Sequence, residues 1–116
     1  MTALEYLQQA ARNSGLEVST EFRSTSRGVV ITPRSFEVSK VYGQKQRVMS
    51  YRVSLTLIGE CVANGELFDT MDILTAAFLK DQTAGGSANE VLVDQWNSVE
   101  MDKNYTVFET QITIKE

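Results

Sequence analysis

The chain has 116 residues, of which 42% are hydrophobic and 22% are charged, and this composition indicates one ordered globular domain. Its net charge of −4 argues against a free-standing nucleic-acid-binding protein, because affinity for phosphate comes from clustered Lys and Arg. The absence of histidine excludes Ser-His-Asp and Cys-His catalytic centres and His-containing zinc sites within one chain.

The first predicted element is a short helix. Thr2 and Glu5 form a capping box, in which the Thr hydroxyl accepts from the backbone N–H of Glu5. Apolar residues at helical spacing then form one stripe, made up of Leu4, Leu7, Ala10 and Ala11. Asn13-Ser14-Gly15 ends the helix, since Gly15 can take the left-handed conformation.

Extended structure is predicted after this helix. Alternating apolar residues from Leu16 indicate one segment, and a turn follows at residues 24–28. A short β-branched strand at residues 29–31 closes at Pro33, the only proline. A separate short strand is expected at residues 36–38.

The clearest strand in the sequence spans residues 49–57. Apolar and polar residues alternate, so one face is apolar and the other is expected to be solvated or to meet a partner. The apolar face consists of Met49, Tyr51, Val53, Leu55 and Leu57. The polar segment 42–47 contains a glycine and predicts the tip of a hairpin, whose first strand ends near Val41.

A second helix is predicted from Asn64 to Lys80, with Asn64 as its cap. Its core-facing stripe consists of Leu67, Met71, Leu74 and Phe78. Residues 81–89 are expected to form a surface loop with little hydrophobic anchoring.

The last predicted element is a hairpin. Its first strand leads from Val91 to Met101 and a turn at residues 102–104, and its second strand places Phe108, Ile112 and Ile114 on one face. The whole pattern predicts a single α+β domain over residues 1–116, with two helices on one face of a mostly antiparallel sheet. The expected order is α-β-β-α-β-β, with extra short strands.

Two features could carry chemistry, and each has a simpler interpretation. Glu66, Asp69 and Asp72 indicate a solvated helix face rather than a cation site, because no hard-cation loop accompanies them. Cys61 has no neighbouring base or cation in the sequence, so a small core residue is expected rather than a nucleophile. As the only cysteine it forms no internal disulfide. We therefore expect a protein that binds or assembles, without catalysis, cofactor or metal.

The most suggestive surface is the predicted hairpin around residues 40–52. Basic residues there alternate with Tyr42 and Tyr51, which is typical either of nucleic-acid binding or of a charged hairpin that protects a sheet edge. The loop Gly85-Gly86-Ser87 is a second candidate, because such loops often order on assembly. The candidate subunit or partner contacts are Lys40, Tyr42, Gln44, Lys45, Arg47, Arg52, Gly85 and Gly86.

The element order and two strand segments, residues 43–55 (GQKQRVMSYRVSL) and 105–114 (YTVFETQITI), resemble a known family over nearly the whole chain. This family is the tail terminators of long-tailed bacteriophages, including the minor capsid proteins of phages of Gram-positive hosts. The resemblance implies a structural virion protein that forms a ring, typically a hexamer, on the end of the tail tube. Such a ring stops tube growth, joins the tail to head-completion proteins, and lets DNA pass through its lumen.

The expected location is therefore the virion tail, after assembly in the host cytoplasm. The N-terminal sequence shows no signal-peptide pattern, no apolar run is long enough to span a membrane, and no membrane partner is expected. Two alternatives remain. The chain could be another head–tail connector or a tail-tube subunit, or it could be a small ferredoxin-like ligand-binding or enzymatic module. The last alternative predicts an apolar pocket between the sheet and the helices.

Overall fold

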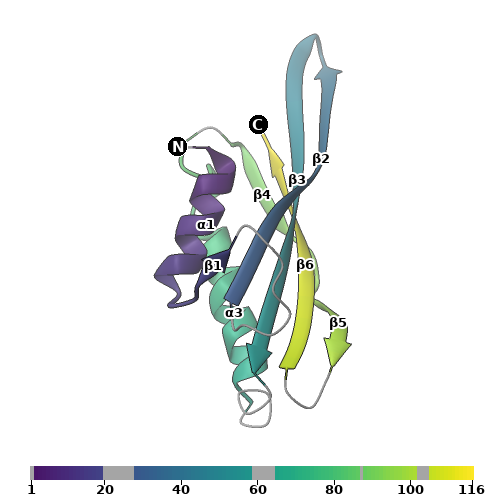
Figure 1. Cartoon of the computed structure of the whole chain (residues 1–116). Helices are drawn as coiled ribbons and strands as arrows, with labels where there is room; N and C mark the ends of the chain where they lie inside the picture. Colours follow the sequence, from purple (N-terminus) through teal and green to yellow (C-terminus); the bar gives the residue numbers. More distant parts are fainter. Residues whose placement is uncertain (1, 20–27, 59–64, 87, 102–104) are drawn as a thin grey trace.

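The computed structural model describes the chain in five segments, which are residues 2–19, 28–58, 65–86, 88–101 and 105–116. In chain order the elements are α1 (Ala3–Asn13), β1 (Val18–Ser19), β2 (Gly28–Val41), β3 (Gln44–Ile58), α3 (Glu66–Leu79), β4 (Glu90–Val93), β5 (Asn97–Met101) and β6 (Tyr105–Lys115) (Figure 1). The predictions for Cys61 and Asn64, the turn at residues 102–104 and most of the turn at residues 24–28 lie outside the described residues.

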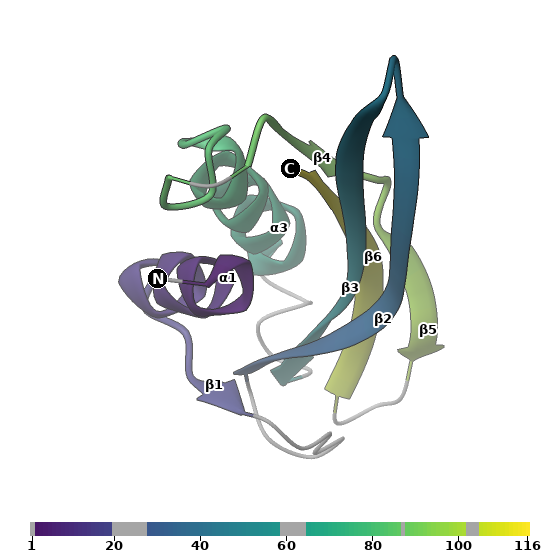
Figure 2. The same ribbon diagram turned by 90° about the horizontal axis from the view of Figure 1, so that it is seen from above.

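The described strands form one sheet in the order β1-β2-β3-β6-β4, and β5 also pairs with β6. β1 runs parallel to β2, and the other pairs are antiparallel. Both helices lie on the same face of this sheet (Figure 2). The predicted α+β class and arrangement are therefore confirmed, with β1 and β5 as additional short strands.

α1 begins with the predicted capping interaction. The N–H of Glu5 donates to the Thr2 hydroxyl at 3.2 Å, and this hydroxyl donates to the Glu5 carboxylate at 3.2 Å. Gly15 has a φ of 85°, which is the left-handed conformation predicted for the end of the helix. The buried members of the apolar stripe are Leu7, Ala10 and Ala11, while Leu4 is partly buried.

β2 is one strand of 14 residues, so the predicted break at Pro33 is wrong. The N–H of Val29 donates to the carbonyl of Glu17 at 2.8 Å, on the side of β2 away from β3. Backbone groups at alternate positions face the same side of an edge strand, so Ile31 and Pro33 also face outward. The missing N–H of Pro33 therefore removes no bond to β3. The only irregularity in the β2–β3 pairing is a β-bulge between Pro33 and Ser35.

A two-residue turn, Tyr42-Gly43, joins β2 to β3. Val41 pairs with Gln44, and the two turn residues have φ values of 53° and 80°. Positive φ at both central positions is typical of a type I′ turn, whose twist matches that of the paired strands. The hairpin tip is therefore shorter than the predicted segment 42–47, and the residues from Gln44 onward belong to β3.

α3 starts at Glu66, directly after Gly65, which has a φ of 78° and supplies no side-chain cap. The helix ends at Leu79, close to the predicted end. Its core stripe is confirmed, because each member is at most 6% exposed: Leu67, Met71, Leu74 and Phe78.

The loop between α3 and β4 is better anchored than the sequence predicts. Ala84 and Ala88 are buried in the core. The Asp81 carboxylate accepts hydrogen bonds from the hydroxyl and N–H of Thr83 and from the N–H of Gly85. Two short apolar side chains and an Asp-centred turn therefore fix a segment that composition alone describes as loose.

Residues 91–101 form two strands where one was predicted. Between β4 and β5, the Trp96 indole N–H donates to the Thr75 hydroxyl of α3 at 3.0 Å. The Asp94 carbonyl accepts from the Thr110 hydroxyl at 2.7 Å. These bonds replace the regular ladder to β6 at this point, and β5 resumes the pairing further along β6.

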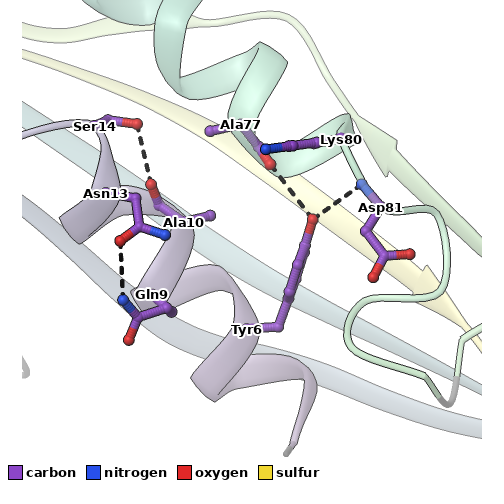
Figure 3. Close-up of a pocket in the computed structure, with 8 residues that line it drawn as sticks. All are labelled: Tyr6, Gln9, Ala10, Asn13, Ser14, Ala77, Lys80 and Asp81. Carbon is purple, nitrogen blue, oxygen red and sulfur yellow. Dashed lines mark hydrogen bonds between the residues drawn. The ribbon is translucent and has the colours of Figure 1, made fainter.

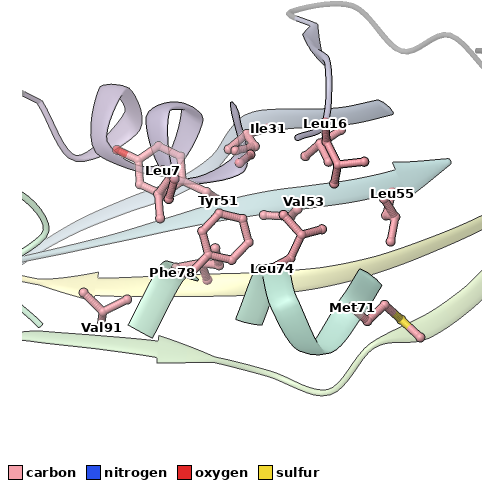
Figure 4. Close-up of a cluster of buried hydrophobic side chains, with 14 of the residues drawn as sticks. Leu7, Leu16, Ile31, Tyr51, Val53, Leu55, Met71, Leu74, Phe78 and Val91 are labelled. Carbon is pink, nitrogen blue, oxygen red and sulfur yellow. The ribbon is translucent and has the colours of Figure 1, made fainter. Parts of the chain in front are cut away.

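The core lies between the helices and the sheet. Figure 4 shows Leu74 and Phe78 of α3 and Leu7 of α1 among the inward-facing side chains of β3. Four of the five predicted inward-facing residues of β3 are buried, and Met49 is partly buried. These four are Tyr51, Val53, Leu55 and Leu57.

The opposite face of β3 is also sheltered, although the sequence predicts a solvated face or one that meets a partner. The Gln111 amide donates to the Ser50 hydroxyl at 3.3 Å, and Arg52 forms a salt bridge with Glu109 at 3.7 Å. These interactions join β3 to β6 over the short side chains of the central strand. The buried hydroxyl residues of β3 are Ser50, Ser54 and Thr56.

Candidate assembly surfaces

The β2–β3 hairpin extends beyond the helices as an arm, which we define as residues 34–48 (Figure 1). The molecule measures 53 × 22 × 22 Å, and this arm accounts for much of its elongation. Neither helix covers the end of the arm (Figure 2). Its side chains therefore contribute little to the core and are available for contacts with another molecule.

Three large apolar or aromatic side chains of the arm are exposed. Phe36 is 60% exposed, Val38 is 43% exposed, and Tyr42 at the tip is fully exposed. Phe36 pairs with Met49, which packs against the core, so the bulge after Pro33 turns Phe36 and Val38 toward the helix side of the sheet. The arm thus continues the apolar face of the sheet past the point where the helices cover it.

The arm is also basic. Residues 34–48 contain four basic side chains and one acidic side chain, a net charge of +3, which leaves −7 on the rest of the chain. Lys40 and Lys45 are direct cross-strand partners, and like charges directly opposite each other destabilise a sheet. Within the described part of the chain, neither lysine forms a salt bridge.

Arg47 is held in place at the base of these charges. Its Nε lies 3.2 Å from the Glu116 carboxylate, and its guanidinium lies 5.4 Å from the ring centre of Phe36. An Arg over an aromatic face is a cation–π contact. We call the exposed set the arm patch, and it consists of Phe36, Val38, Lys40, Tyr42, Lys45 and Arg47.

Among the described residues, no strand pairs with the outer edge of β2 along the arm. β1 pairs only with Val29 and Val30, and no other described strand lies on that side. With a two-residue turn, the pair next to the tip is hydrogen-bonded, so the backbone groups of Phe36 and Val38 face outward. An edge of this kind is a template for a strand from another molecule.

A second exposed apolar surface lies on α3, on the side away from the core. Phe68 is 71% exposed and Ile73 is 55% exposed. Asp69 and Asp72 lie beside them and are also exposed. At their spacing all four share one helix face, which we call the α3 patch: Phe68, Asp69, Asp72 and Ile73.

The structure brings most of the predicted contact residues together. Lys40, Tyr42, Gln44, Lys45 and Arg47 all belong to the arm and are exposed. Gly85 and Gly86 are exposed as well, but they belong to the loop between α3 and β4.

Arg52 and Tyr51 do not belong to this group. Tyr51 is a buried core residue, so it is not an exposed aromatic of a nucleic-acid surface. Burial and the nearby Glu116 carboxylate raise the pKa of its phenol. Arg52 lies on the sheet face away from the helices, where with Val99 and Glu109 it lines a depression of about 320 Å³.

A cleft of about 530 Å³ lies between α1 and the end of α3 (Figure 3). The Tyr6 hydroxyl reaches across it, donating to the Ala77 carbonyl at 3.4 Å and accepting from the Asp81 N–H at 3.1 Å. Partial burial raises the pKa of Tyr6. This cleft lies between the helices, whereas a ferredoxin-like binding module predicts a pocket between helices and sheet. That space is filled by the core described above.

The Asp81 turn at the edge of this cleft gives a pH-dependent prediction. Hydrogen bonds from the Thr83 hydroxyl and from backbone N–H groups hold the pKa of Asp81 below its usual range. A lowered pKa in the folded state means that this stabilisation is present above the unfolded pKa and is lost as pH falls through the folded one. We expect Asp81→Ala to be less stable than wild type near neutral pH, with the difference disappearing in acid. Urea unfolding across this range would contradict the prediction if the difference stayed constant.

The residues missed by sequence reasoning are the apolar members of both patches. Phe36 and Val38 were predicted as strand residues without a functional role. Phe68 and Ile73 lie outside the predicted core stripe of α3. Large apolar residues on the other side of a helix could have indicated a second buried surface. Among the described residues no helix is long and apolar enough to cross a membrane, and no group of three or more acidic or Cys side chains is placed to hold a metal ion.

Comparison with known proteins adds no family to this picture. No protein-family model matches the sequence, and no curated protein matches it significantly. The functional argument therefore rests on the surfaces described above and on the element order.

Proposed function

We propose that this chain is a structural protein that assembles with copies of itself into a ring, and that the ring is a tail terminator of a long-tailed bacteriophage. In this role the ring, a hexamer by resemblance to that family, caps the tail tube and joins it to head-completion proteins. DNA passes through its lumen without sequence readout. The protein acts in the virion tail and does so without catalysis.

The exposed arm is the observation that carries this proposal. A monomer gains nothing from a projecting hairpin with exposed Phe36, Val38 and Tyr42 and an open β2 edge, because such surfaces favour aggregation. In an assembly the same features supply apolar area and backbone hydrogen bonds to a neighbour. The confirmed order of helices and long paired strands supports the tail-terminator role within the class of assembling proteins.

Electron microscopy and sedimentation velocity test the proposal together. The purified chain is mixed with tubes of the tail-tube protein from the same virus. We expect rings at one end of each tube, and tubes that no longer lengthen when more tube protein is added. Free chains that leave the tubes uncapped and growing would overturn the proposed role.

The same experiment separates the nearest structural alternative. A tail-tube subunit would polymerise into long cylinders by itself, whereas a terminator forms closed rings. The order of genes gives an independent check, because a gene for a major tail protein immediately downstream is expected for a terminator.

A further inference from the structure

We infer that the arm patch of one copy docks on the α3 patch of the next copy. The inference rests on the proposed function, since it specifies the junction between neighbouring subunits of the ring. The occupant of each patch is a second copy of this chain, held in a head-to-tail arrangement.

The first argument is that α3 is apolar on two sides. Its inner side carries the core stripe, and its outer side carries Phe68 and Ile73, with the partly exposed Leu79 further along. A helix on the surface of a monomer normally has a polar outer face. α1 follows that rule, since the outward residues Gln8, Gln9, Arg12 and Asn13 are polar. α3 departs from it, as a helix does when both of its sides are covered.

The second argument is that the two patches have opposite charge. The arm patch places Lys40 and Lys45 opposite each other, and the α3 patch places Asp69 and Asp72 three residues apart on one helix face. Each is a pair of like charges, which is unfavourable within one chain. Each becomes favourable when it faces the other pair across an interface, and the surrounding apolar side chains then become buried together.

The third argument is that one chain cannot join its own two patches. β3 runs from the arm tip to Ile58, and α3 begins shortly after that far end of the strand (Figure 1). Phe68 and Asp69, in the first turn of α3, therefore lie at the opposite end of a 53 Å molecule from Tyr42. Two different patches that fit each other at opposite ends form a heterologous contact, which generates rings or open filaments rather than two-fold dimers.

Complementation between two variants tests this pairing. The arm variant is Phe36→Ser with Val38→Ser, and the helix variant is Phe68→Ser with Ile73→Ser. All four side chains are exposed, so both variants are expected to fold, and circular dichroism checks this. The matched control is Leu92→Ser with Val99→Ser, two exposed apolar residues outside both patches.

Sedimentation velocity up to the solubility limit is the measurement. We expect the wild type and the control to self-associate, and each patch variant alone to associate at least about tenfold more weakly. An equimolar mixture of the two variants retains one intact junction, formed by the arm of the helix variant and the α3 patch of the arm variant. The mixture should therefore form one-to-one dimers and no larger species.

Charge reversal gives a second, independent readout. Lys40→Glu with Lys45→Glu should prevent assembly, and adding Asp69→Lys with Asp72→Lys in the same chain should restore it. If the lysines only stabilised the fold of the arm, the added changes on α3 would not restore assembly. Restored assembly would therefore support direct pairing of the two patches.

Three outcomes would overturn the docking pair. A wild type that stays monomeric up to its solubility limit would do so, and tube capping then decides separately whether the proposed function stands. Assembly that survives in either patch variant would place the junction elsewhere and leave the ring intact. Two patch variants that fail alone and also fail to form dimers when mixed would show that the arm patch of one copy does not dock on the α3 patch of another.

Discussion

Replacing Phe78 by alanine is expected to lower the free energy of unfolding by about 4 kcal/mol. Phe78 is fully buried on the inner side of α3, where its ring fills the space between this helix and β3 (Figure 4). The loss combines the transfer free energy of the ring with the cavity that remains. Because domains of this size are stable by about 5–15 kcal/mol, the loss is a large fraction of the total, and the variant should unfold at a clearly lower urea concentration than wild type.

Phe68→Ala on the same helix is the matched control for this prediction. Its ring is 71% exposed, so urea unfolding at a concentration that keeps the chain monomeric should change by less than about 0.5 kcal/mol. Equal losses for the two variants would contradict the assignment of an inner and an outer side to α3. A small loss for Phe78→Ala alone would show that the core can close around the missing ring.

Gly28→Ala is expected to lower the free energy of unfolding by about 1–3 kcal/mol. A Cβ at Gly28 would lie 2.8 Å from the carbonyl oxygen of Glu17, and that oxygen accepts the N–H of Val29 at 2.8 Å. The added methyl group must push this backbone away and weaken the pairing of β1 with β2. Urea unfolding measures the total effect, and hydrogen exchange at the Val29 amide should show a local increase. Unchanged exchange at Val29 would mean that the close approach tolerates a side chain.

Local patterns in the sequence were enough to predict the parts of the fold that depend on nearest neighbours. The capping box of α1, the core stripe of α3 and the alternation in β3 all report on one element and the face it buries. The break assigned at Pro33 was wrong because proline is tolerated on an edge strand, and strand order is not visible in a local pattern. The break after Val93 was missed for a related reason, since the bond from Trp96 to Thr75 joins residues in different elements.

The candidate site was predictable only in part for the same reason. A polar segment with a glycine indicated the arm tip, and the structure places Lys40, Tyr42 and Lys45 there. Phe36 and Val38 were not assigned to the surface, because their side of the sheet depends on the bulge at residues 33–35 and on where the helices end. Arg52 lies on the other face of the sheet from the arm patch, and proximity in sequence does not show which face of a strand a side chain occupies.

The bulge between Pro33 and Ser35 inserts one extra residue into β2, and this insertion affects the direction in which the arm projects. A bulge bends its strand and increases the local twist, so loss of the extra residue would straighten β2 and change the direction of the arm, while Phe36 would still pair with Met49. The core-forming half of β2 would keep its register, because it lies on the other side of the bulge. Insertions and deletions here are therefore a route by which related sequences could re-aim an interface without altering the domain that carries it.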